Sequence, residues 1–142
     1  MAYNKILIAI DSSPRSLSTA KAGFEIARLL HAHIGLVYVI DRAREMVSAD
    51  LGLTPEMSQT VLLKQAQETM AQIIELNAGN EQVYRFTPEG FPEKEILDTA
   101  KEWEADMIVV GARSQTPVDR FIRGNLVSRI IKHSPKPVVV VN

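Results

Sequence analysis

Short runs of apolar, largely β-branched residues recur along the chain and are separated by segments with helical spacing. This alternation constrains the fold more than any other feature. A continuous apolar run of about four to eight residues is typical of a strand that is covered on both faces. The predicted strands span residues 5–10, 33–40, 82–86, 106–111 and 137–141.

Helical spacing and terminal signals mark the segments between these strands. Ser13 and Thr54 are predicted N-caps, and a proline follows each of them. Proline fits the first turn of a helix because the N–H that it lacks would have no partner there. Gly79 is predicted to end the second helix as a C-terminal breaker. The remaining predictions are a third helix opened by Pro92, a fourth over residues 125–133 and a loop over residues 41–53.

Strands that alternate with helices imply an α/β fold, in which an open parallel sheet carries helices on both faces. Right-handed crossover connections leave few topologies for such a sheet. Its ligands bind beyond the carboxyl ends of the strands, at the point where the strand order reverses. Two strand ends are candidates for this point, one at Ile10–Asp11 and the other at Val110–Gly111. The 142 residues are expected to form a single domain with one core.

The charge balance and the absence of cysteine exclude several classes of protein. The formal net charge of −1 argues against a general nucleic-acid binder, which would carry a basic excess. Without cysteine the chain has no disulfides, thiolate catalysis or cysteine-ligated metal, and this composition suits a reducing compartment. The apolar run at residues 6–10 is too short for a membrane span or a secretory signal. We therefore expect a soluble, cytoplasmic protein that binds neither nucleic acid nor membrane.

Four stretches of the sequence, taken in order, carry a resemblance to a known family. They are MAYNKILIAIDSS, IGLVYVID, EGFPEKEILDTAKEWEADMIVVGARS and SPKPVVVV. Together they resemble the universal stress proteins (UspA-like) over nearly the whole chain. The resemblance implies one universal stress protein domain over residues 1–142, with a Rossmann-like fold of the adenine nucleotide alpha hydrolase type. It also implies a five-stranded parallel sheet in the order 3-2-1-4-5 and a homodimer made through the last strand, here Val138–Val141.

A glycine-rich motif distinguishes the members of this family that bind nucleotides. Many members bind ATP or another adenine nucleotide and carry Gly-x2-Gly-x9-Gly-Ser/Thr, whereas others bind none. Gly111 and Gly124 match this motif at the family's spacing, but Ser114 replaces its second glycine and Asn125 replaces its Ser/Thr. A serine held at positive φ costs about 1 kcal/mol or more of strain. The serine hydroxyl and the asparagine amide are nevertheless hydrogen-bond donors that can meet a phosphate.

The resemblance implies a nucleotide site at the two strand ends and the start of the last helix. Asp11 is implied to contact the adenosine, with Ala9 and Val39 beside the adenine; otherwise this aspartate stabilises the N-terminus of the following helix. If a nucleotide binds, Mg²⁺ is expected to bridge its phosphates, because the sequence holds no all-protein metal cage. The residues implied on the other side of the site are Val110, Gly111, Arg113, Ser114, Gly124, Asn125 and Leu126.

Two other functional classes stay open. The chain is alternatively a dimeric interaction module without a nucleotide, in which residues 112–123 form a surface for a protein partner. An enzyme, at most a slow ATPase, lacks an identifiable general base, and no Gly-x-Ser-x-Gly elbow supports serine catalysis. His31 and His33 neither share a helical face nor complete a metal ligand set. His31, like His133, is instead predicted to interact with a helix C-terminus.

Overall fold

A computed structural model describes residues 2–41, 52, 54–112 and 126–142. Each predicted strand and helix has a counterpart in it. No helix in these ranges combines the length and the hydrophobicity that a membrane span requires. In chain order the elements are β1 (Lys5–Ile10), α1 (Arg15–Leu30), β2 (His33–Tyr38), β3 (Ile40–Asp41), α3 (Pro55–Asn77), β4 (Val83–Phe86), β5 (Glu89–Gly90), α4 (Pro92–Trp103), β6 (Met107–Gly111), α6 (Leu126–His133) and β7 (Val138–Val141).

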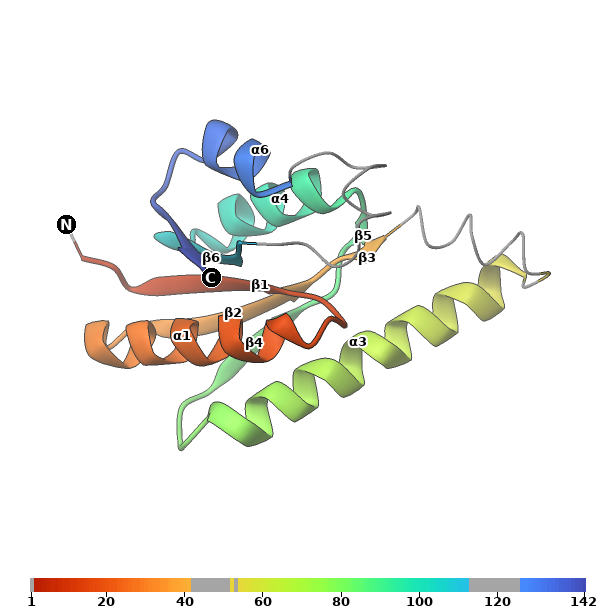
Figure 1. Cartoon of the computed structure of the whole chain (residues 1–142), viewed down its shortest axis with the longest axis horizontal. Helices are drawn as coiled ribbons and strands as arrows, with labels where there is room; N and C mark the ends of the chain where they lie inside the picture. Colours follow the sequence, from red (N-terminus) through yellow and green to blue (C-terminus); the bar gives the residue numbers. More distant parts are fainter. Residues whose placement is uncertain (1, 42–51, 53, 113–125) are drawn as a thin grey trace.

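Five strands form one sheet in the spatial order β4-β2-β1-β6-β7 (Figure 1). Every pairing in this sheet is parallel. When the two-residue strands are left out, the order counted along the chain is 3-2-1-4-5, so the predicted fold class is confirmed. The strand order reverses between β1 and β6, since β2 and β4 lie on one side of β1 while β6 and β7 lie on the other.

The predicted strand over residues 33–40 is shorter than expected, because the chain changes its partner near the end of that run. β2 stops at Tyr38, and Ile40 and Asp41 form β3, which pairs with β5 in a separate two-stranded sheet. The N–H of Ile40 donates to the carbonyl of Pro88 at 2.8 Å. This second sheet, which was not predicted, carries Asp41 past the end of β2.

Helices cover both faces of the main sheet (Figure 1). α1 and α3 pack against one set of strand side chains, and α4 and α6 pack against the other set. In β1 the two sets interleave: Ile6 and Ile8 belong to the cluster with α1 and α3, and Leu7 belongs to the cluster with α4 and α6. All three side chains are fully buried. Burial of each such side chain stabilises the fold by about 1.5–3 kcal/mol. Because β1 contributes side chains of this kind to both clusters, it forms the centre of the core.

Two of the predicted helix starts are confirmed. The Thr54 side chain accepts a hydrogen bond from the N–H of Met57 at 3.1 Å, and Pro55 is the first residue of α3. Pro92 likewise opens α4. A proline fits this position because the first N–H of a helix has no acceptor within the helix.

The prediction that Ser13 caps α1 is wrong. α1 starts at Arg15 with Pro14 in the cap position, and its start has no side-chain cap. The Ser13 N–H instead donates to Oδ1 of Asp11 at 2.7 Å. The aspartate therefore organises this turn, because its side chain reaches the backbone N–H two residues further on.

α3 ends just before Gly79, the predicted breaker, but neither its cap residue nor this glycine is left-handed. α3 ends at Asn77, and its cap residue Ala78 has an extended backbone with φ −75° rather than a left-handed one. The Ala78 N–H closes the helix by donating to the Ile74 carbonyl at 2.8 Å.

α1 ends differently, because His31 adopts the left-handed conformation with φ 53° and donates its N–H to the last turn. His31 therefore meets the helix end through its backbone.

α1 lies very close to the end of β6, at Gly111. A Cβ atom at this position would lie 2.8 Å from Oγ1 of Thr19, which is closer than real Cβ atoms approach a neighbour. Thr19 is almost fully buried, and its hydroxyl donates to the Arg15 carbonyl at 3.1 Å, which restricts its rotation. The glycine therefore allows α1 to pack against this strand end.

We expect Gly111→Ala to lower the free energy of unfolding by about 1–2 kcal/mol, because the added methyl group displaces the Thr19 hydroxyl. In a Thr19→Ala background the obstructing oxygen is absent, so the same substitution should cost less than about 0.5 kcal/mol. Urea unfolding of the four proteins in this double-mutant cycle measures the difference. Equal costs in the two backgrounds would show that the Thr19 contact does not constrain Gly111.

Candidate functional site

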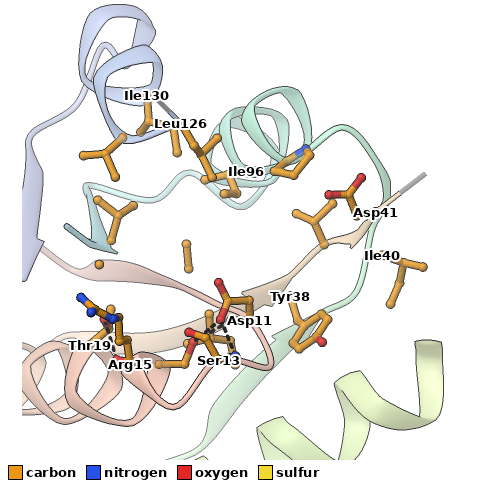
Figure 2. Close-up of a pocket in the computed structure, with 18 of the residues that line it drawn as sticks. Asp11, Ser13, Arg15, Thr19, Tyr38, Ile40, Asp41, Ile96, Leu126 and Ile130 are labelled. Carbon is orange, nitrogen blue, oxygen red and sulfur yellow. Dashed lines mark hydrogen bonds between the residues drawn. The ribbon is translucent and has the colours of Figure 1, made fainter. Parts of the chain in front are cut away.

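A pocket opens at the carboxyl ends of β1, β2 and β6, next to the point where the strand order reverses (Figure 2). α1 forms one side of it, and α4 and α6 form the other. The fold thus brings together segments that are far apart in the chain. Six of the predicted site residues line this pocket: Ala9, Asp11, Val39, Val110, Gly111 and Leu126.

The other four predicted site residues lie outside the described part of the chain. They are Arg113, Ser114, Gly124 and Asn125. Gly111 ends β6 and Leu126 begins α6, so these two residues flank the segment that is not described. Since both of them line the pocket, the first glycine of the motif and the residue that follows the motif border it.

Asp11 is held by the first turn of α1. Its Oδ1 accepts hydrogen bonds from the N–H of Ser13 at 2.7 Å and from the hydroxyl of Ser16 at 3.1 Å. The Asp11 N–H donates in turn to the Ser16 hydroxyl at 2.8 Å. These contacts match the alternative interpretation of this aspartate, in which it stabilises the start of the following helix. They also fix the orientation of a carboxylate at the pocket wall, where it can accept a hydrogen bond.

Apolar side chains make up much of the pocket wall. Tyr38, Val39 and Ile40 contribute from the end of β2 and from β3. Ile96 and Ile130 contribute from α4 and α6 on the other side (Figure 2). An apolar pocket with a small number of fixed polar groups is the usual form of a site for a small organic molecule.

Polar residues that the sequence did not assign to the site also line the pocket. Arg15, Ser16 and Thr19 lie on the first turns of α1, and Asp41 lies in β3. Ser16, Thr19 and Asp41 are buried, whereas Arg15 is exposed. The sequence could have indicated the three helix residues as part of the site, because their spacing puts them on one side of a helix that directly follows Asp11.

The histidines contact helix ends and protein side chains rather than a metal-binding cluster. Within residues 2–41, 52, 54–112 and 126–142, no three His, Asp, Glu or Cys side chains gather in a way that could hold a metal ion. His133 is the last residue of α6, and its Nδ1 lies 3.0 Å from the Arg129 carbonyl, so its predicted contact with a helix end is confirmed. The same nitrogen lies 2.9 Å from Oε1 of Glu93, which links α6 to α4.

Comparison with known proteins identifies relatives over the full length of the chain. Residues 2–142 match the model of the universal stress protein family. Universal stress protein MJ0531 of Methanocaldococcus jannaschii is 32% identical over 144 residues, which cover 98% of this chain and 82% of that protein. Universal stress protein YxiE of Bacillus subtilis is 27% identical over 147 residues, which cover 98% of this chain and 99% of that protein.

Solved structures of related proteins share the arrangement of strands and helices. Universal stress protein UspA from Lactobacillus plantarum superposes with a TM-score of 0.74 at 25% identity and covers 100% of this chain and 99% of its own. MJ0577 of M. jannaschii superposes with a TM-score of 0.80 at 26% identity and covers 99% of this chain and 96% of its own. Sequence and fold agree, and the chain therefore belongs to the universal stress protein family.

Proposed function

We propose that this protein binds an adenine nucleotide in the pocket at the carboxyl ends of β1 and β6. The observation that carries the proposal is the position of the pocket between Asp11 and Gly111, where the strand order reverses. Ligands of open parallel sheets bind at this point. Two solved proteins of this fold were crystallised with cAMP and with dAMP. At 17% and 22% identity they share the fold with this chain, and their ligands motivate the proposal.

The pocket offers different contacts to the different parts of a nucleotide. The apolar side chains of Val39 and Ile96 suit the adenine ring, and the Asp11 carboxylate can accept a hydrogen bond from a ribose hydroxyl or the adenine amino group. The start of α6 at Leu126 suits the phosphates, because N–H groups at a helix N-terminus attract anions. Mg²⁺ bound together with the nucleotide would neutralise part of the phosphate charge, since this ion prefers phosphate oxygens and water to an all-protein cage.

We propose that the protein acts as a sensor. In our proposal the protein responds to the level of an adenine nucleotide in the cytoplasm during stress, and it does so by binding rather than by efficient catalysis. The competing function is a dimeric interaction module with no nucleotide, in which the same surface meets a protein partner. Direct measurement of nucleotide binding separates these two functions.

We expect the wild-type protein to bind ATP in isothermal titration calorimetry and Val39→Phe to weaken that binding at least tenfold, or roughly 1.4 kcal/mol. Val39 is half-buried at the pocket wall, so the larger ring occupies space that the adenine needs. Circular dichroism and urea unfolding verify that the variant is folded.

Val61→Phe is the matched control, since Val61 is 57% exposed on α3 and does not line the pocket. This variant should bind ATP as the wild type does. Ser114→Gly combined with Asn125→Ser restores the family's motif and should strengthen the binding. If neither the wild type nor this restored variant binds ATP, ADP, AMP or cAMP at millimolar concentration, the nucleotide proposal is wrong and the result favours the interaction module.

We also propose that two copies of the chain pair through β7, the last strand on its side of the sheet within the described residues. The carbonyls of Pro137 and Val141 accept hydrogen bonds from N–H groups on the β6 side. Backbone groups alternate in direction along a strand, so those of Val138 and Val140 point toward the open edge. A continuous apolar edge strand of this kind invites pairing with another strand.

Val140→Pro is expected to convert the dimer into a monomer, because proline removes an N–H at the open edge and leaves the bonds to β6 in place. Size-exclusion chromatography with light scattering should show the mass falling from twice the 15.8 kDa chain mass to that mass. Val140→Thr keeps both the N–H and the β-branched shape, so this control should stay dimeric. A wild-type protein that is monomeric at micromolar concentration would contradict the proposal.

A further inference from the structure

The pocket contains side chains of both charges. Asp11 and Asp41 are the carboxylates among its described lining residues, and Arg15 is the cation among them. Phosphate groups are repelled by carboxylates at short range, so a nucleotide in this pocket needs a cation near its phosphates. Arg15 is the exposed first residue of α1, and the first turn of that helix has no acidic residue.

The Arg15 guanidinium forms no ion pair or hydrogen bond with the residues that the structure describes. The carbonyl of Arg15 is engaged, since it accepts hydrogen bonds from the hydroxyls of Ser18 at 3.0 Å and Thr19 at 3.1 Å. Other arginines differ in this respect: Arg28 and Arg129 each pair with a glutamate. The donors of the Arg15 guanidinium are therefore available for a ligand.

Arg15 lies at the end of the pocket where β6 stops. It precedes Thr19 by one helical turn, and Thr19 is the residue that a Cβ atom at Gly111 would meet at 2.8 Å. Figure 2 shows Arg15 and Thr19 together at one end of the pocket and Tyr38 and Ile40 toward the other. The cation is thus on the side of Gly111 and away from the apolar wall at the end of β2.

We infer that Arg15 binds the terminal phosphates of the nucleotide and makes the site selective for adenosine di- and triphosphates. The inference rests on the nucleotide site proposed above. A guanidinium presents its donors in a planar fork that matches two oxygens of one phosphate group. ADP and ATP carry phosphates beyond the first that can meet this fork. Adenosine carries none, and AMP and cyclic AMP carry only the first.

Titration calorimetry of the full chain with ATP, AMP and adenosine tests this assignment. Arg15→Gln should weaken ATP binding by roughly tenfold, because one charge-assisted contact is lost, and should leave adenosine binding unchanged. Arg15→Lys keeps the charge without the fork and should lose a smaller factor. Lys21→Gln removes an exposed cation from the same helix outside the pocket, so this matched control should bind ATP as the wild type does.

The salt dependence of binding provides a second measurement. Because the Arg15 contact is exposed to solvent, added salt should weaken ATP binding to the wild type more than to Arg15→Gln. If the wild type binds ATP and adenosine equally tightly, or if Arg15→Gln weakens both ligands by the same factor, the role of Arg15 is wrong while the nucleotide site stands. If the wild type binds none of the ligands, the proposed function fails and this inference fails with it.

Discussion

The central strand β1 is paired along both edges and buried on both faces, and the rest of the structure is arranged around it. Its pairing with β2 extends from Lys5 to Ile10, and β6 pairs with its other edge. Ile6, Leu7 and Ile8 have no exposed surface. Because side chains alternate between the two faces of a strand, these residues join the α1–α3 layer to the α4–α6 layer.

The position of the pocket follows from this arrangement. Parallel strands end at the same edge of the sheet, so Asp11, Val39 and Val110 are brought to one place although they are distant in the chain. The helices after β1 and β2 cover one face, and the helix before β6 covers the other. The crevice therefore opens between β1 and β6. The hydrogen bonds between Asp11 and Ser16, at 3.1 and 2.8 Å, hold the start of α1 against this edge.

The strands and the α/β class could be predicted because the spacing of hydrophobic residues is visible in the local sequence and matches the faces that each element buries. The strand order was predicted from the family resemblance. Helix starts were less predictable. Thr54 and Ser13 are both hydroxyl residues followed by proline, yet only Thr54 caps its helix. The difference lies in the surroundings, since Asp11 occupies the Ser13 N–H and organises that turn instead. The split of the run 33–40 was also missed, because Ile40 depends on a partner strand at Glu89.

Hydrophobic spacing in the sequence was enough to predict the five main strands and the helices between them, and it marked Asp11 and Gly111 as the strand ends that border the pocket. Which other side chains line the pocket depends on how distant segments pack together in the folded chain. Arg15 and Thr19 line it because α1 packs closely against the end of β6, where Gly111 has no Cβ to prevent the approach. Asp41 lines it because the chain leaves the main sheet after β2 and then forms β3, which pairs with β5. Such contacts join segments that are far apart in the chain, so they cannot be predicted from the local sequence around either residue.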